Sequence, residues 1–365
     1  MFDIFLEDGS INPFIAILAI ITIMKVMEHA QEQFQPQHPE QAGRVGECLM
    51  EVLWNKYRGM YLDDGTDERP PKQRKNYDHN RAKQCITANW MEPQPLFDDQ
   101  QFECTFWVTH HVADQILQVV KDTSPFFCNG TDATGKANID PQVKLLMALK
   151  VLVYGNSPSA FLDFFQISKT TARHCVQNLT TILSQSNDVR ELYLRSITRG
   201  DARQAASLHE RIHGVPGKIG SMDCIHVAWQ TCPVGWQGQF KGKEPGPAIV
   251  LKAVANHNLW IWHHAFGFAS SLNDINIFDQ STLLQAFLDG TFTRDIDFEY
   301  EIDGKVFSEL FVLVDGIYPE ISRFVKTYEE PLTADRKRYA KWQEASRKDV
   351  ERAFGVLQQK FHVLV

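Results

Sequence analysis

The sequence lacks the features that define several large classes of protein. Its seven cysteines form no Cys-x-x-Cys pair and no regular ladder, which excludes a secreted disulfide framework and indicates reduced thiols in an intracellular protein. The longest apolar stretch, about 12 residues from Pro13 to Met24, is shorter than the roughly 20 that a membrane-spanning helix needs. We expect this stretch to be a buried helix or strand, and we expect no membrane partner. No internal repeat and no targeting segment stands out.

What is present is an ordinary globular composition with uneven charge. The 365 residues are 44% hydrophobic and 22% charged, which suits about two domains with sizeable cores. The formal net charge of −8 argues against nucleic-acid binding when it is averaged over the chain. However, basic residues outnumber acidic ones in 135–215 and 321–365, whereas acidic residues dominate 1–134 and 216–320. Two basic segments that bracket an acidic one are what a polyanion-binding protein with a metal site would carry.

A polar, charged and proline-interrupted stretch at residues 60–84 predicts a flexible linker. Its basic part, from Lys72 to Lys83, is typical of a solvated loop, and a nuclear address or a phosphate contact is the alternative. The linker falls within an N-terminal region that we assign to residues 1–134.

Residues 141–183 have the pattern of a helix-turn-helix. Apolar residues recur at three- and four-residue steps from Pro141 to Tyr154, a short helix follows at 159–165, and Ser168 is the expected N-cap of a third helix. Small, hydroxylated and basic residues lead that third helix, which would offer Thr170, Thr171 and Arg173 to DNA. Three packed helices without a DNA role are the alternative.

Strand-like segments begin near residue 218. The continuous apolar run at 311–314 predicts a strand buried on both faces, and a long helix is expected from about Ala334. With a helix expected at 274–288, these segments predict a mixed sheet flanked by helices. The other expected strands are 219–229, 248–256 and 259–268, with a tight turn at His257-Asn258, and a hairpin over 299–307 about Asp303-Gly304.

Acidic residues occupy the positions that a sheet-based active site would use. Asp223 lies within the first strand, Asp315 ends the buried strand, and Glu351 lies on the flank of the last helix. Asp274 opens a helix, where simple capping is the alternative. Carboxylates that converge repel one another, and a pair of Mg²⁺ ions relieves this repulsion while serving phosphodiester chemistry. Routine surface acids are the alternative.

Basic residues of the same last helix, Arg347, Lys348 and Arg352, would surround the substrate backbone with positive charge. A zinc site built from Cys224, His226 and Cys232 lacks an obvious fourth ligand, so core packing is the simpler interpretation of His226.

Several segments resemble the transposon proteins of the PIF/Harbinger superfamily, in the order in which that family carries them. The resemblance extends over about residues 140–361, and the last two segments are the most specific. The segments are Gly220-Ser-Met-Asp-Cys-Ile-His226, Ala248-Ile-Val-Leu-Lys-Ala-Val-Ala-Asn256, Leu259-Trp-Ile-Trp-His263, Leu272-Asn-Asp-Ile-Asn276, Val314-Asp-Gly-Ile-Tyr-Pro319 and Arg347-Lys-Asp-Val-Glu-Arg-Ala-Phe-Gly-Val-Leu357.

The resemblance implies an RNase H-like fold and a DDE transposase that cuts transposon ends and joins the 3′-hydroxyls to target DNA. Matched by motif, Asp223, Asp315 and Glu351 correspond to the catalytic, metal-binding triad, and Asp274 corresponds to a further metal ligand. Mg²⁺ is the implied cofactor, with Mn²⁺ as its substitute. The implied partners are the terminal repeats, the target DNA and a Myb-like DNA-binding protein, with homo-oligomeric assembly in the nucleus.

The resemblance also suggests the domain boundaries and the alternatives. We assign residues 135–212 to a helical DNA-binding region and residues 213–365 to the catalytic domain. The family normally continues beyond the segment that ends at Leu357, so we expect a catalytic domain that is truncated at its C-terminus. A catalytically inactive, transposase-derived DNA-binding protein of the nucleus is the alternative. A metal-dependent nuclease without strand transfer is the third hypothesis.

Overall fold

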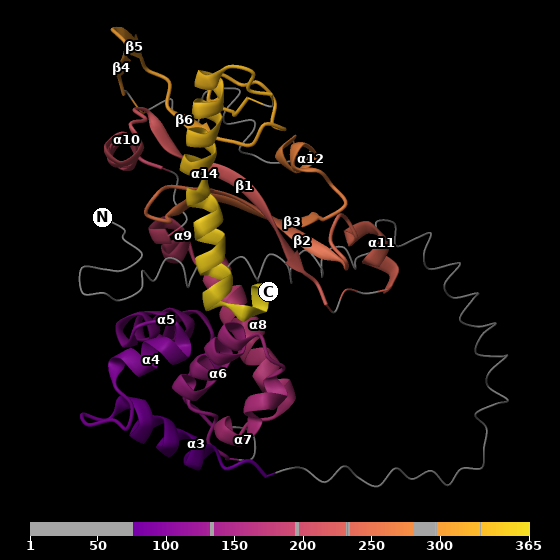
Figure 1. Ribbon diagram of the computed structural model, residues 1–365. Helices are drawn as coiled ribbons and strands as arrows, with labels where there is room; N and C mark the ends of the chain where they lie inside the picture. Colours follow the sequence, from indigo (N-terminus) through magenta and orange to yellow (C-terminus); the bar gives the residue numbers. More distant parts are fainter. Residues whose placement is uncertain are drawn as a thin grey trace, which may run out of the picture.

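The computed structural model describes residues 76–131, 135–193, 197–230, 232, 234–279, 296, 298–328 and 330–365. A helical body comes first in the chain and a sheet with covering helices follows it, with the last helix running from the sheet to the helical body (Figure 1). The apolar stretch from Pro13 to Met24 and residues 60–75 of the expected linker lie outside the described residues.

The helical body consists of short helices around one central helix. That central helix is α6 (Pro141–Tyr154), in which apolar residues face nearly every direction and are buried. Asp140 caps α6 by accepting a hydrogen bond from the Gln142 backbone N–H at 2.9 Å, and Gly155 ends it in the left-handed conformation. Near it lie α3 (His79–Ile86), the π-helical turn η1 (Thr87–Met91), α4 (Asp99–Phe106), α5 (His110–Thr123) and η2 (Pro125–Phe127). Two later helices are α9 (Asn187–Tyr193) and α10 (Arg199–His213), and α10 packs on the sheet rather than on α6 (Figure 1).

Residues 79–84 are helical, so the prediction of a linker over residues 60–84 is wrong at its C-terminal end. Asp78 caps α3 by accepting a hydrogen bond from the Arg81 backbone N–H at 3.0 Å. Ala82 is buried in the hydrophobic core, and Lys83 forms a 2.9 Å ion pair with Asp140. The polar composition did not indicate this helix, because only Ala82 and Ile86 of α3 are buried.

The helices expected at 141–183 are present. After α6 come the 3₁₀ turn η3 (Pro158–Phe161), the short helix α7 (Leu162–Phe165) and the long helix α8 (Lys169–Gln185). Ser168 caps α8 as predicted, because its Oγ accepts a hydrogen bond from the Thr171 backbone N–H at 3.0 Å. The helices are confirmed, and their use as a DNA-binding motif stays a prediction.

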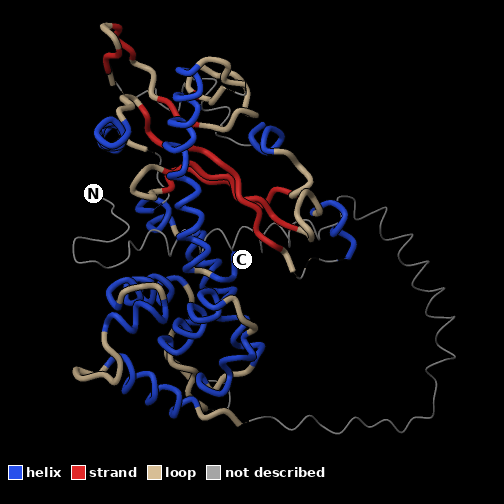
Figure 2. The backbone as a smooth tube through the Cα atoms, viewed as in Figure 1, coloured by secondary structure: helices blue, strands red, loops and turns tan. Residues whose placement is uncertain are grey.

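The sheet has five strands in the order β3-β2-β1-β6-β7. Its strands are drawn in red in Figure 2, with helices in blue around them. The first three are antiparallel neighbours, whereas β1, β6 and β7 are parallel, so the predicted mixed sheet is confirmed. Beside it lies a separate hairpin, β4 (Tyr300–Ile302) and β5 (Lys305–Phe307). The five strands are β1 (Lys218–Ala228), β2 (Ala248–Ala255), β3 (Ile261–Ala269), β6 (Phe311–Leu313) and β7 (Phe324–Val325).

Helices cover the sheet and join it to the helical body. The last helix, α14 (Ala334–Lys360), packs along β1 and buries Val350, Phe354 and Leu357 (Figure 1). The 3₁₀ turn η6 (His362–Leu364) then reaches α6, where a side chain at Gly155 would meet the backbone of His362 at 2.8 Å. Smaller helices at the sheet are η4 (Val234–Trp236), α11 (Gln237–Phe240) and α12 (Asp274–Asp279), and the remainder of the helix expected at 274–288 lies outside the described residues.

Candidate functional site

The strand register places Asp223 and Asp315 side by side. β1 and β6 run parallel, with Ser221 opposite Leu313 as their last matched pair. Asp223 and Asp315 each lie two residues beyond that pair, so both follow the same pleat on neighbouring strands. Both residues are only partly buried. Two acids that are far apart in sequence therefore occupy matched positions on neighbouring strands, where the pairing of β1 with β6 ends.

The turn after β6 fixes the position of Asp315. Its carboxylate Oδ1 accepts a hydrogen bond from the Gly316 backbone N–H at 2.7 Å, and its backbone carbonyl accepts one from the Tyr318 N–H at 3.3 Å. Tyr318 is buried in the core, which anchors the far end of this turn. The carboxylate is thus held at the end of a rigid buried strand, where a catalytic acid can be oriented by the fold.

Arg347 connects Asp223 to Glu351. Its guanidinium donates from Nη1 to Asp223 Oδ2 at 2.9 Å, and its Nη2 lies 3.6 Å from Glu351 Oε1, one helical turn along α14. The Arg347 side chain is only 14% exposed, whereas that of Glu351 is 47% exposed. Glu351 therefore reaches the same edge of the sheet as Asp223, with a cation between them.

Electrostatics at this edge favour an additional cation. Burial raises the pKa of Asp223, Arg347 lowers it, and the charges of Glu351 and Asp274 raise it again, so the net shift is upward. Asp274, the first residue of α12, is thus within electrostatic reach of Asp223. We refer to Asp223, Asp274, Asp315 and Glu351 together as the acid edge.

The acid edge fits Mg²⁺ by the chemistry of its donors, because hard carboxylate oxygens on separate elements are what that ion takes. The oxygens are not gathered into a ligand cage, however. The one group of three candidate ligands that lie within 4.8 Å of one another among the described residues is a different cluster. The structure brings the four predicted acids to one region, with Arg347 as the present counter-charge of Asp223.

The predicted DNA-contacting residues differ in how exposed they are. Thr170 and Arg173 on α8 and Lys348 on α14 are exposed. Thr171 is half-buried at the cap of α8, where its Oγ1 lies 2.8 Å from Ser168 Oγ. Arg352 is exposed but donates a hydrogen bond to the His257 carbonyl in the turn between β2 and β3.

His226 has a structural partner. Its Nδ1 lies 2.9 Å from Ser270 Oγ, which links β1 to the end of β3. This contact agrees with the interpretation of His226 as a packing residue.

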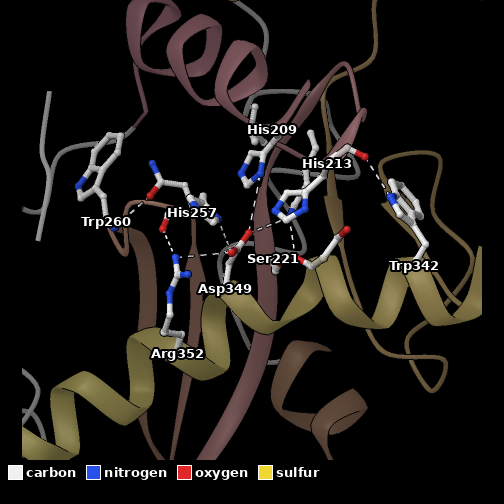
Figure 3. A network of polar contacts seen from close by, with 12 residues as sticks. His209, His213, Ser221, His257, Trp260, Trp342, Asp349 and Arg352 are labelled. Carbon is white, nitrogen blue, oxygen red and sulfur yellow. Dashed lines mark hydrogen bonds and ion pairs between the residues drawn. The ribbon is translucent and has the colours of Figure 1, made fainter. Parts of the chain in front are cut away.

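A second polar cluster lies where α10, the β2–β3 turn and α14 meet (Figure 3). We refer to His209, His213, His257 and Asp349 as the histidine cluster. Asp349 Oδ1 lies 2.8 Å from His257 Nδ1, and Asp349 Oδ2 lies 2.9 Å from the Lys218 ammonium and 3.8 Å from His209 Nδ1. Lys218, at the start of β1, is fully buried and also donates to the Ser346 carbonyl at 2.8 Å.

Burial decides the charge state of this cluster. Burial and the nearby Lys218 ammonium lower the pKa of His209 to about 2, so this imidazole is neutral. Burial alone would raise the pKa of Asp349, but Lys218 outweighs it and holds that pKa below its usual range. An ionised aspartate therefore faces a neutral imidazole and an ammonium in the core.

The sequence did not predict the histidine cluster. The one local signal was the spacing of His209 and His213, four residues apart on one helix, which places both rings on the same face. His257 and Asp349 are distant in sequence, and only the packing of α14 on β1 brings them to α10. No motif spacing carries that information.

Comparison with known protein families gives a match over the C-terminal part of the chain. Residues 191–365 match a protein family described as plant transposon protein. No curated protein and no solved structure matches the chain. In the part of the chain that the structure describes, no helix is both long and apolar enough to cross a membrane.

Proposed function

We propose that this chain is a transposon-derived protein that cuts and joins DNA as a DDE transposase, and the match of residues 191–365 to plant transposon proteins supports this origin. The observation that carries the proposal is the acid edge. Asp223 and Asp315 lie on neighbouring parallel strands, and Arg347 links Asp223 to Glu351. These are the three acids that the PIF/Harbinger resemblance assigns to catalysis, and the family match is compatible with that placement.

Asp223, Asp315 and Glu351 would hold Mg²⁺, with Asp274 assisting and Mn²⁺ as the substitute. When bound, the ions lower the pKa of the attacking water and neutralise charge on the leaving oxygen. The protein supplies rigid positioning, because Asp315 ends a buried strand and Asp223 lies within a long one. The attack displaces one oxygen at phosphorus in line, so no side chain forms a covalent intermediate.

Arg347 has a defined part in this scheme. In the present arrangement its guanidinium balances the charges of Asp223 and Glu351. With a divalent ion held by the same carboxylates, the Arg347 guanidinium would be free to bind a DNA phosphate next to the cut. Lys348, the exposed neighbour of Arg347, and Arg352 extend this basic surface along α14.

The proposal also includes an RNase H-like core and a DNA-binding helix-turn-helix. An RNase H-like core is supported by three antiparallel strands that continue into parallel ones, with Asp223 on the central strand β1. A helix-turn-helix is supported by the capped helix α8, which exposes Thr170 and Arg173 to solvent. DNA ends and target DNA, a Myb-like partner, homo-oligomeric assembly and a nuclear location complete the proposal.

Calorimetric titration of the full chain with Mg²⁺ tests the metal site without knowledge of the DNA sequence. We expect binding in the wild type and at least about 10-fold weaker binding in Asp315→Asn and Glu351→Gln, because each removes an anionic ligand of similar shape. The matched control is Glu344→Gln, which neutralises an exposed glutamate on the same helix. Mg²⁺ binding that responds equally to all three variants would contradict the proposal.

A second assay separates the reaction classes. Nicking of supercoiled plasmid in Mg²⁺ or Mn²⁺ reports hydrolysis, and labelled 3′ ends joined to a target duplex report strand transfer. Nicking without joining would leave a metal-dependent nuclease. DNA binding without either reaction would leave the inactive DNA-binding protein.

A further inference from the structure

The histidine cluster has the geometry of a metal site that is separate from the acid edge. His209 and His213 on α10 and Asp349 on α14 each offer a ligand atom, and these atoms all lie within 4.8 Å of one another. Figure 3 shows the two rings pointing from α10 toward the aspartate on α14. Two histidines one helical turn apart, joined by a carboxylate from another element, form a frequent zinc-binding arrangement.

The cluster also contains buried nitrogen atoms that the protein leaves unpaired. His209 is fully buried, and neither of its ring nitrogens has a hydrogen-bond partner in the described part of the chain. The Nε2 atom of His213 is likewise buried without a partner. An unpaired buried polar atom costs about 1–3 kcal/mol, so native structures rarely keep one without a reason. A metal ion that takes the one lone pair of each neutral ring would give one nitrogen of each histidine a partner.

His257 lies next to these three residues and is the candidate for a fourth ligand. His257, in the turn between β2 and β3, holds its Nδ1 at 2.8 Å from Asp349 Oδ1. Its ring centroid lies 5.4 Å from that of His213 and 6.3 Å from that of His209. His257 is 25% exposed, which provides an entry path from solvent. Three imidazoles and one carboxylate complete the four ligands that zinc prefers.

We propose that His209, His213, His257 and Asp349 bind one Zn²⁺ ion, which fastens α10 and the β2–β3 turn to α14. Imidazole nitrogen favours Zn²⁺ over Mg²⁺, so this site and the acid edge select different ions. Lys218 stays on Asp349 Oδ2, where it orients the ligand carboxylate from outside the metal shell. The proposal does not depend on the proposed catalytic function.

The neighbouring charges set an upper limit on the affinity. The Lys218 ammonium lies 2.9 Å from Asp349, and the Arg352 guanidinium lies 3.8 Å from it. Both repel a divalent cation, so we expect a Kd on the order of 1–10 µM, weaker than that of structural zinc sites in zinc-finger peptides.

The position of Asp349 suggests what the ion does. Asp349 lies between Arg347 and Glu351 in sequence, and its side chain points to the other side of α14 because two residues turn a helix by about 200°. A metal that fixes Asp349 to α10 therefore fixes the same helical turn that carries the acid edge. The zinc site would act as a clamp that positions Arg347 and Glu351 from behind.

The test is calorimetric titration of the full chain with Zn²⁺ after treatment with a chelator. We expect one equivalent of Zn²⁺ to bind, and Co²⁺ in its place to give the visible absorption of a tetrahedral nitrogen and oxygen site. His213→Asn and His257→Asn should weaken Zn²⁺ binding by about 100-fold or more, at or above the upper end of what loss of an outer-shell partner costs. Both residues are partly exposed, so these variants should keep the fold, which far-ultraviolet circular dichroism checks.

Two controls make the result specific. His174→Asn removes an exposed histidine of α8 and should leave Zn²⁺ affinity unchanged. Asp315→Asn, which alters the acid edge, should also leave Zn²⁺ affinity unchanged even if it abolishes Mg²⁺ binding. Absence of Zn²⁺ binding, or binding that His213→Asn and His257→Asn leave intact, would overturn the proposal whatever the outcome for Mg²⁺.

Discussion

Two charged clusters lie on opposite sides of one turn of α14, and the carboxylate pKa shifts in opposite directions in the two. At the histidine cluster, the buried Asp349 faces the Lys218 ammonium, and its pKa falls. At the acid edge, Asp223 shares the single guanidinium of Arg347 with Glu351, and its pKa rises. One cluster has its negative charge balanced from within, and the other carries more negative charge than its neighbours balance.

The comparison distinguishes buried charges that stabilise the fold from partly exposed charges that can bind a cation. A buried ion pair resists removal of either partner, because the remaining charge is left in a medium of low dielectric constant. A half-exposed cluster of acids can accept a cation from solvent at little structural cost. We therefore expect changes at the acid edge to alter chemistry more than folding, and changes at the Lys218–Asp349 pair to alter folding more than chemistry.

The largest effect is expected on the reaction itself. Asp223→Asn should lower the rate of plasmid nicking by about 10³-fold or more, because it removes one of the carboxylates that would hold the metal ions. Circular dichroism should show an unchanged fold, since Asp223 is only partly buried. A nicking rate equal to that of the control variant Glu344→Gln would contradict the role of Asp223 in the reaction.

The next effect concerns stability. Asp349→Leu leaves Lys218 buried without its carboxylate and should lower the free energy of unfolding by about 3–5 kcal/mol in a urea titration with chelator present. The double variant Lys218→Met/Asp349→Leu should recover most of this loss, because no unpaired ammonium remains buried at this position. If the double variant is as unstable as the single one, charge pairing is not what Asp349 contributes.

The two clusters also differ in how far the sequence predicted them. Local chemistry was predictable: Ser168 caps α8, and the hairpin turns at Asp303-Gly304 as expected, with φ of 49° and 76° at those two residues. The run at 311–314 is a buried strand, which put Asp315 at a strand end. Each of these features depends on residues that are close in sequence.

Long-range packing was not predictable. Nothing in the sequence shows that Arg347, expected to face DNA, binds Asp223 across the sheet edge. Nor does it show that Lys218 meets Asp349, because residues 131 positions apart meet only through the packing of α14 on β1. The strand and helix pattern pointed to the members of the acid edge and the resemblance assigned them a role, whereas neither pointed to the histidine cluster.

A smaller effect should follow from pH. His209 keeps a pKa of about 2 in the folded protein, whereas an unfolded histidine titrates near 6.5. Below pH 6.5 His209 therefore binds a proton in the unfolded chain but stays neutral in the folded protein. The free energy of unfolding falls as the pH falls for this reason. Between pH 7 and pH 5 the loss attributable to His209 should be about 2 kcal/mol.

Urea titrations at pH 7 and pH 5, with chelator present, measure this loss. His209→Gln should show a pH dependence that is smaller by about that amount, whatever its absolute stability. His174→Asn, at an exposed position, should keep the pH dependence of the wild type. If His209→Gln keeps the full pH dependence of the free energy of unfolding, a group other than His209 causes it.

The smallest effect sharpens the contrast at the acid edge. Arg347→Gln removes the guanidinium that pairs with Asp223 and Glu351 and should strengthen Mg²⁺ binding by about 10-fold, because the ion no longer competes with a fixed cation. Lys348→Gln removes the neighbouring exposed charge and should change Mg²⁺ affinity much less, since solvent screens it. If both variants shift Mg²⁺ affinity equally, the summed positive charge of α14 sets that affinity and the contacts of Arg347 do not. A shift confined to Arg347→Gln would show that this guanidinium occupies the position of the metal charge.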